Sequence, residues 1–213
     1  PVQVARFRAE RPGLTDVSFF ADIPTARLLR NTDVVQTKLE TGLFVSDPGR
    51  RLLIAARDSE TVRLRQLDAV SHRSWHRTFA PGEYLYRVEA RQHASGNRAR
   101  GLSAVNVPLF AEGQFALSDL LVARRIAPRQ AGAKPRSRDD LFIVPNGAMS
   151  FSRNDTIFVY YETYGLTPDS TGQARAKVEL TLRVDQIQRS DRVQAVLGSV
   201  LDRVGLTAEG DDR

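Results

Sequence analysis

Residues 80–107 read APGEYLYRVEARQHASGNRARGLSAVNV, and this stretch decides the fold class of the chain. After the Pro81-Gly82 turn, apolar side chains occupy every second position from Tyr84 to Ala90. This period of two is typical of a half-buried antiparallel strand, because successive side chains point to opposite faces of a sheet. Turn residues at 95–97 separate this strand from a second alternating run. The stretch therefore predicts a long hairpin entered through a Pro-Gly-x-Tyr turn, which is common near the end of Ig-like and fibronectin-type sandwiches.

The same alternation precedes this hairpin along the chain. One face of the run from residue 35 to residue 45 is apolar or threonine, with Val35, Thr37, Leu39, Thr41, Leu43 and Val45. The turn residues Ser46-Asp47-Pro48-Gly49 predict that the next run returns as a partner strand. Shorter or weaker runs of the same kind lie at residues 2–5, 17–22, 51–56, 61–70 and 73–79. About seven strands with frequent turns predict one sandwich domain over residues 1–110.

A second strand-rich unit begins after this domain. Its apolar or alternating runs are residues 115–122, 141–144, 156–164 and 174–184. The last run has the clearest alternation of the chain, with Ala176, Val178, Leu180, Leu182 and Val184 on one face. The unit does not reach a Pro-Gly-x-Tyr hairpin of its own. We therefore predict a second, incomplete sandwich over residues 113–185.

The spacing of apolar residues changes after residue 185. Helical spacing joins Val193, Val196, Leu197, Val200, Leu201 and Val204. This spacing predicts an amphipathic helix at about 191–204, with a flexible tail in the rest of 186–213. The predicted fold class is thus mostly β: tandem Ig-like or fibronectin-type antiparallel sandwiches, the second incomplete, followed by a short C-terminal helix.

Three segments occur in the order found in a known bacterial family. They are Pro81-Gly82-Glu83-Tyr84 with its hairpin, LSDLLVA at 117–123, and Val144-Pro145-Asn146 followed by FVYYETYGL at 158–166. These segments resemble the C-terminal β-rich, Ig-like region of GWxTD-motif proteins, and the resemblance covers most of residues 1–185. The namesake Gly-Trp-x-Thr-Asp motif is absent, since Trp75 lies in a Ser-Trp-His sequence.

This resemblance implies an exported or cell-envelope protein of a Gram-negative bacterium, in a family without an established biochemical activity. We therefore expect a periplasmic, cell-envelope or extracellular location. The chain begins at Pro1 instead of Met, which predicts a processed product or an internal fragment of a larger protein.

Composition narrows the function classes. The chain has no cysteine, which excludes disulfides, zinc-thiolate sites and a thiol nucleophile. No run approaches the roughly 18 apolar residues of a membrane-spanning helix, so no transmembrane segment is predicted. The net charge of +6 comes almost entirely from arginine. Because the arginines are spread along the chain among acidic residues, we expect no specific nucleic-acid partner.

Candidate catalytic and metal-binding residues are few. His72 and His76 have a spacing that would suit one metal ion on a helix, but their segment is predicted to be a strand or loop. Ser118-Asp119 lacks the glycine framing of a nucleophile elbow, so we interpret its side chains as hydrogen-bonding groups at a strand start or turn. The pairs Asp139-Asp140 and Asp211-Asp212 lack the alternating spacing of calcium loops.

We therefore predict no catalytic residue, no metal site and no cofactor. A hydrolase is the least favoured class. It would require a cleft that holds a histidine beside a carboxylate or a serine, and we expect none.

The densest basic segment is the loop 124–138. Its cations are Arg124, Arg125, Arg129, Lys134, Arg136 and Arg138. They could contact lipid headgroups, an acidic polymer or an acidic partner, and a solvated interdomain loop is the alternative. Tyr160, Tyr161 and Tyr164 could form a sugar-stacking platform with Trp75. Alternation separates Tyr161 from the other two tyrosines, however, so at least one of the three should be buried.

These observations favour a non-enzymatic structural or interaction module of a larger exported or cell-envelope bacterial protein. Its partners would be other domains of the same parent chain or another protein. The open edge of the incomplete sandwich predicts strand pairing or a homo-oligomer. The alternative is a ligand-binding module for glycan or for an anionic polymer or lipid, through the 124–138 loop.

Overall fold

The computed structural model describes residues 1–25, 36–63, 70–93, 95–130, 132, 135, 137–168, 170, 174 and 176–181. Contacts divide the chain into two compact units, Pro1–Ala174 and Arg175–Arg213. The helix predicted at about 191–204, with the rest of the tail 186–213, lies outside the described residues.

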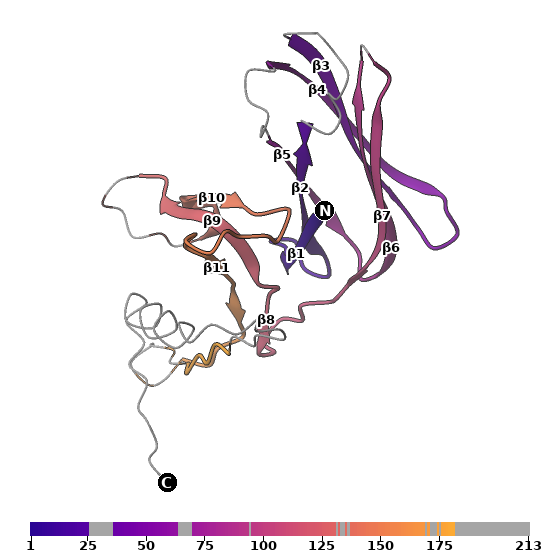
Figure 1. Ribbon diagram of the computed structural model, residues 1–213. Coiled ribbons are helices and arrows are strands. Elements are labelled where there is room, and N and C mark those ends of the chain that lie inside the picture. The colour runs from indigo at the N-terminus through magenta and orange to yellow at the C-terminus, as the bar shows by residue number, and fades with distance from the viewer. Residues whose placement is uncertain are drawn as a thin grey trace, which may run out of the picture. The chain divides into compact units, whose positions relative to one another are not determined.

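The first seven strands form two antiparallel sheets (Figure 1). One sheet has the order β1-β2-β5, from β1 (Val2–Arg8), β2 (Thr15–Pro24) and β5 (Val70–Phe79). The other has the order β4-β3-β6-β7, from β3 (Gln36–Ser46), β4 (Leu52–Arg63), β6 (Gly82–Gln92) and β7 (Arg98–Val107). The fourth strand pairs with the third, unlike in a constant-type Ig domain, where it lies beside the fifth. The structure confirms the predicted mostly β sandwich class.

The main core lies between these two sheets, on the faces that the alternation predicts. Phe19 of β2 is fully buried, and its ring centroid lies 5.2 Å from that of Tyr86 on β6. The hydroxyl of Tyr84 donates a hydrogen bond to the carbonyl oxygen of Ala80 at 2.9 Å. Gly82 has a φ of 149°, a value that residues with a side chain rarely adopt. The predicted Pro-Gly-x-Tyr turn is therefore anchored by its tyrosine at the entry to β6.

Strand β4 is longer than the sequence pattern predicts. The expected strand at 51–56 continues to Arg63 and pairs with the whole of β3. Of the strand expected at 61–70, residues 61–63 end β4, Val70 begins β5, and residues 64–69 lie outside the described residues. The reason is the length of β3, whose ladder groups need partners along the full hairpin.

The remaining strands form a smaller sheet system. Strands β9 (Leu121–Pro128), β10 (Leu141–Pro145) and β11 (Phe158–Tyr160) form an antiparallel sheet in the order β10-β9-β11. A separate pair joins β8 (Ala116–Leu117) to β12 (Thr163–Tyr164). A single 3-10 turn, η1 (Arg138–Asp140), precedes β10.

Three expectations for this region are wrong in detail. The run 156–164 is split into β11 and β12, because Glu162 between them bonds to Ser118 through its backbone. The start of the 124–138 segment is not a loop, since β9 continues to Pro128. The run 174–184 was expected to be the clearest strand, yet its described residues 176–181 are exposed and lie in no strand. Alternation alone does not create a strand, because the backbone also needs a neighbouring ladder.

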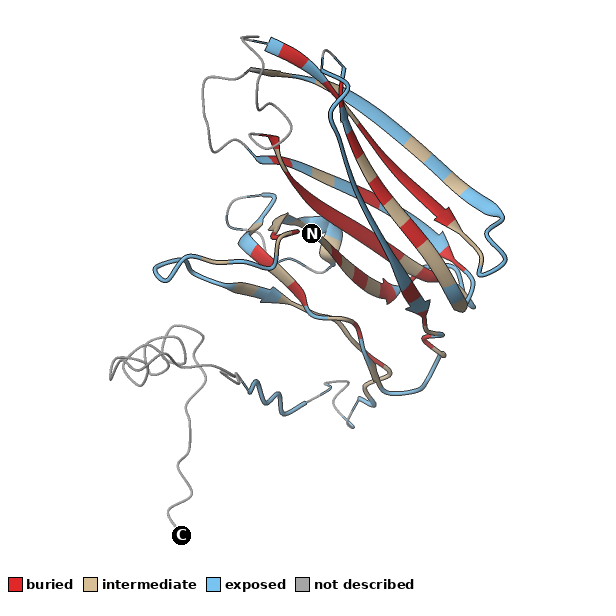
Figure 2. Cartoon of the chain, turned by 45° about the vertical axis from the view of Figure 1, so that its right-hand side comes forward, coloured by how far each residue is buried: buried red, intermediate tan, exposed pale blue. Residues whose placement is uncertain are grey.

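The sheet β1-β2-β5 is the middle layer of three. One face contributes to the sandwich core, and the other packs against β9, β10 and β11 through a second cluster. That cluster contains Ala5, Phe7 and Phe20 from the middle sheet with Leu121 from β9, and Ile143 and Tyr160 pack against it. Strand β2 is consequently buried on both faces from Val17 to Ile23 (Figure 2).

The predicted domain boundary near residue 110 falls between β7 and β8. Contacts between β1 and β9 cross it, and both sheet systems belong to the compact unit Pro1–Ala174. Gly147, in the predicted Pro-Asn-Gly turn, shows how closely they meet. A Cβ atom at this position would lie 2.7 Å from both the amide nitrogen of Asp22 and the carbonyl oxygen of Phe20.

We expect Gly147→Ala to destabilise this unit by about 1–3 kcal/mol, because the methyl group would push the turn away from the backbone of β2. Urea denaturation followed by tryptophan fluorescence measures the change in unfolding free energy. Gly101→Ala is the matched control, since an added Cβ there meets no atom within 4 Å. Equal stability of the two variants would contradict the tight contact.

Candidate interaction surfaces

The Leu-Ser-Asp segment fastens the small sheet system to β1. Asp119 accepts hydrogen bonds from Arg6 through both carboxylate oxygens, at 2.5 Å from Nε and 2.7 Å from Nη2. It also accepts the backbone N–H of Arg6 at 2.9 Å. This contact raises the pKa of the Arg6 guanidinium. The Ser118 hydroxyl bonds to the backbone of Asp119 and of Glu162, so the interpretation of this segment as a hydrogen-bonding element is confirmed.

The side chain of Gln3 bonds to the backbone of β9 as the backbone of a neighbouring strand would. Its side-chain amide donates to the carbonyl oxygen of Val122 at 2.9 Å, and its carbonyl accepts the N–H of the same residue at 2.7 Å. The same amide also donates to the carbonyl oxygen of Asn146 at 2.9 Å. The side chain of Gln3 thus bonds to both backbone groups of Val122, whose carbonyl oxygen also accepts the backbone N–H of Asn146 at 3.0 Å.

A buried carboxylate forms the centre of the next cluster. Asp22 lies 2.7 Å from Nδ1 of His72 and 3.3 Å from Nη2 of Arg124, and it accepts the backbone N–H of Ala148 at 3.2 Å. The side chain of Asp22 is 6% exposed. Because a buried carboxylate without partners is costly, these contacts hold the 145–150 turn against β2.

Two histidines of β5 each lie beside a carboxylate or a serine, the pairing that the cleft of a hydrolase would require. His72 contacts Asp22, and Nδ1 of His76 lies 2.8 Å from the hydroxyl of Ser18. Each pair is formed by directly opposite residues of β2 and β5. The two histidines are four residues apart along β5, or about 13 Å. The pairs therefore do not combine into one serine-histidine-aspartate relay. Burial and the nearby Arg138 lower the pKa of His76.

Glu162 organises the tyrosines of the FVYYETYGL segment. Its two carboxylate oxygens accept hydrogen bonds from the hydroxyls of Tyr160 at 2.9 Å and Tyr164 at 2.5 Å. Tyr164 is buried, which confirms that at least one tyrosine belongs to the core. Burial, with the hydrogen bond to Glu162 as the next cause, raises the pKa of both hydroxyls well above the usual value. The cluster is structural in its contacts, because its rings pack on Phe7 and Phe110.

The predicted anion-contact residues are not gathered at one place. Arg124 is paired with Asp22, and Arg138 lies 3.4 Å from both Asp16 and Glu162 with its guanidinium over the ring of Phe7. Arg125 and Arg129 are exposed. Lys134 and Arg136 lie outside the described residues. A shared anion site for all six cations stays a prediction, and two of the six already have internal acidic partners.

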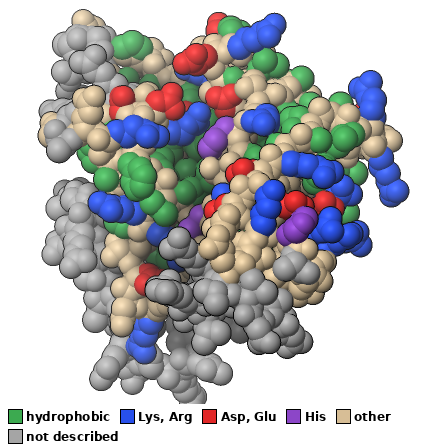
Figure 3. All heavy atoms as spheres, turned by 90° about the horizontal axis from the view of Figure 1, so that it is seen from above, with side chains coloured by type: hydrophobic (Ala, Val, Ile, Leu, Met, Phe, Trp, Pro, Cys, Tyr) green, Lys and Arg blue, Asp and Glu red, His purple; other side chains and the backbone are tan. Residues whose placement is uncertain are grey.

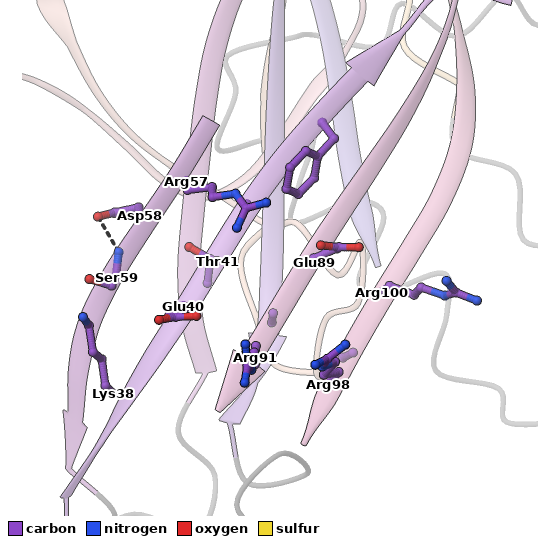
Figure 4. Close-up of a pocket in the computed structure, with 14 residues that line it drawn as sticks. Lys38, Glu40, Thr41, Arg57, Asp58, Ser59, Glu89, Arg91, Arg98 and Arg100 are labelled. Atoms are coloured by element: carbon purple, nitrogen blue, oxygen red, sulfur yellow. Dashed lines mark hydrogen bonds between the residues drawn. The ribbon is translucent and has the colours of Figure 1, made fainter. Parts of the chain in front are cut away.

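Sequence reasoning missed a groove on the outer face of the β4-β3-β6-β7 sheet. It has a volume of about 810 Å³ and is lined by charged side chains of all four strands (Figure 4). The available signal was the polar half of each alternating run, such as Arg87, Glu89 and Arg91 in β6. These positions read as ordinary solvated faces until the strand order brings them together.

A second surface lies on the β10-β9-β11 sheet, on the face turned away from β1. The register places Val122 opposite Val159, and Phe142 lies on the neighbouring strand. Phe142 is 47% exposed and Val159 is 39% exposed. Elsewhere the surface is mixed: on the face seen in Figure 3, basic, acidic and apolar side chains are interspersed.

The function of this chain is inferred from its fold and from these surfaces, because neither of two comparisons with known proteins found a match. No protein-family model matches the sequence. No curated protein matches it either. Within the described ranges, no helix is long and apolar enough to cross a membrane. In the same part of the chain, no three histidine, aspartate or glutamate side chains are grouped to hold a metal ion.

We expect Asp119→Asn to cost about 1–3 kcal/mol of unfolding free energy, because it leaves the partly buried Arg6 guanidinium without its bidentate partner. Chemical denaturation measures the loss. Glu89→Gln is the control, since its pair with Arg87 is more exposed on both sides and should contribute less than about 1 kcal/mol. Similar losses in both variants would show that Asp119 does not fasten the junction.

The tyrosine cluster predicts a loss of stability at alkaline pH. In the folded state the pKa of Tyr160 and of Tyr164 is raised above the usual tyrosine value of about 10, so the unfolded chain releases these protons first. Their contribution is complete below pH 10 and falls as the pH rises above it. Thermal unfolding between pH 8 and 11 should show a steeper decline in the native protein than in the Tyr160→Phe/Tyr164→Phe variant. Tyr161→Phe, outside the cluster, should retain the native slope, and identical slopes in all three proteins would refute the assignment.

Proposed function

We propose that this chain is a non-enzymatic structural and interaction module of a larger exported or cell-envelope bacterial protein. Two features support the proposal. At the junction, Asp119 and Asp22 bond to residues of the facing layer, and His72 and His76 bond to β2 within their own sheet. The Pro-Gly-x-Tyr, Leu-Ser-Asp and FVYYETYGL segments that resemble GWxTD-motif proteins lie at the corners and junctions of the fold.

One observation carries the interaction role. Among the described residues, the sheet β10-β9-β11 ends at β11 on one side and presents the exposed Val159 and Phe142 on its outer face. An edge strand offers unpaired backbone N–H and C=O groups to an incoming strand. A surface with both an open edge and an apolar face accepts an extended segment of alternating apolar and polar residues.

The chain itself contains such a segment at 176–184. Val178 is 36% exposed and Leu180 is 47% exposed, and the described residues 176–181 belong to no sheet. The occupant that we propose is this segment from a second copy of the chain, added to the edge of β11. Because each copy carries both the edge and the segment, a reciprocal exchange closes as a symmetric dimer.

Size-exclusion chromatography with light scattering tests the exchange. The full chain should approach twice its monomer mass of 23.7 kDa as its concentration rises. Val178→Glu with Leu180→Glu should keep it monomeric, because two charges would be buried on the apolar face. Lys177→Gln with Glu179→Gln, on the opposite face of the segment, is the matched control and should still dimerise.

Two outcomes would overturn the proposal. One is a native chain that stays monomeric at every concentration. The other is a monomer in which the amides of 178–180 are protected from hydrogen exchange, since the segment would then pair within its own chain.

A further inference from the structure

The groove on the outer face of β4-β3-β6-β7 has an excess of cations. Its charged lining consists of Lys38, Arg57, Arg91, Arg98 and Arg100 against Glu40, Asp58 and Glu89. The residues come from four adjacent strands, so the groove crosses three strand spacings, or about 14 Å. This face lies on the opposite side of the sandwich from the β9-β10-β11 sheet. The groove is therefore separate from the surface proposed above and from the 124–138 segment.

Two arginines of the groove lie directly opposite each other on neighbouring strands, and their repulsion lowers the stability of the fold. Arg91 of β6 and Arg98 of β7 are direct cross-strand partners, and both are exposed. Figure 4 shows them side by side, with Lys38 at the same end of the groove. Like charges that lie directly opposite on two strands are destabilising. Glu40 is the cross-strand neighbour of Arg91 on β3 and offsets only part of this charge. An anion between Arg91 and Arg98 would remove the repulsion.

The other end of the groove holds a guanidinium over an aromatic ring. The ring of Phe44 contacts two arginines, with the guanidinium of Arg57 at 5.2 Å and that of Arg87 at 4.8 Å from its centroid. Gly42 leaves room for this ring, since a Cβ there would come within 2.9 Å of Cε2 of Phe44. A stacked guanidinium keeps its N–H groups free at its edge, and those groups match a carboxylate or sulfate with two hydrogen bonds.

The groove lining carries both cations and carboxylates, and this mixture favours an acidic chain with hydroxyl groups over a phosphate backbone. Carboxylates at Glu40 and Glu89 would repel a uniformly charged phosphate backbone, but they can accept hydrogen bonds from sugar hydroxyls. Phe44 is only 8% exposed beneath its two arginines, so it offers no face for base stacking. A chain that carries both hydroxyl and acidic groups satisfies the two kinds of lining side chain at once.

We propose that this groove binds an acidic polysaccharide. Arg57, Arg91 and Arg98 donate hydrogen bonds to its carboxylate or sulfate groups, and Glu40 and Glu89 accept hydrogen bonds from its hydroxyls. Binding weakens as salt is added, because the contacts are exposed and screened.

Isothermal titration of the full chain with heparin, repeated with polygalacturonate, tests the assignment. Arg91→Ser with Arg98→Ser should weaken binding at least about tenfold, through the loss of two charge-assisted contacts. This variant should unfold at the same or a higher temperature than the native protein, because it removes a repulsive pair. Arg11→Ser with Arg153→Ser changes the net charge equally at two exposed cations outside the groove and outside the 124–138 segment, and should bind as the native protein does.

Three results would overturn the proposal. The first is no binding of either polysaccharide by the native chain. The second is equal weakening in both double variants, which would mean that only net charge matters. The third is equal or tighter binding of a single-stranded oligonucleotide or of anionic phospholipid vesicles, which would assign the groove to phosphate groups instead.

Discussion

Strand β2 is buried on both faces, because it lies in the middle of three stacked sheets. Val17 and Phe19 point into the sandwich core, and Phe20 points into the cluster shared with β9. A two-sided strand cannot shift its register by one residue without exchanging the two sets of side chains. Strand β2 therefore fixes the positions of the layers that pack on its two faces. The turn at Gly147, for example, lies directly against the β2 backbone.

The two faces of the middle sheet are covered by different kinds of contact. The sandwich core is built on a large apolar cluster, with buried polar residues such as Thr41 and Gln92 on the same strands. The second junction combines a small apolar cluster with Gln3, Arg6–Asp119 and Asp22. Apolar burial supplies most of the free energy of association, but it has no directional preference. The hydrogen-bonded pairs are directional, since leaving any one of them unpaired at depth is costly. They fix which residues of β9 and of the 145–150 turn lie opposite β1 and β2.

A three-layer arrangement leaves two outward faces, and these have opposite chemistry. The face of β4-β3-β6-β7 carries the charged groove, whose like-charged arginines are available to an acidic ligand. The face of β10-β9-β11 exposes Phe142 and Val159, and among the described residues its sheet ends at β11. The proposed polysaccharide and the proposed strand of a second copy would thus bind on opposite sides of the middle sheet, so that neither occupant needs to displace the other.

The sequence by itself determined the most strongly alternating strands of the sandwich and the faces that they turn to the main core. Alternation at Tyr84 to Ala90 and in β3 predicted both the strand type and the buried face, because side-chain direction in a strand depends on position alone. The tertiary structure decided what covers each face. The alternation of their strands did not show what Gln3 and Phe20 contact, and Arg124 and Arg138 belonged to a segment predicted to be a solvated loop or an anion contact. Each of the four has a partner about a hundred residues or more away along the chain, with separations of 119 for Gln3 and Val122 and of 122 for Arg138 and Asp16. A pattern of neighbouring residues carries no information about contacts so far along the chain. For the same reason, the alternation at 176–181 could not show whether a neighbouring strand was present to pair with it.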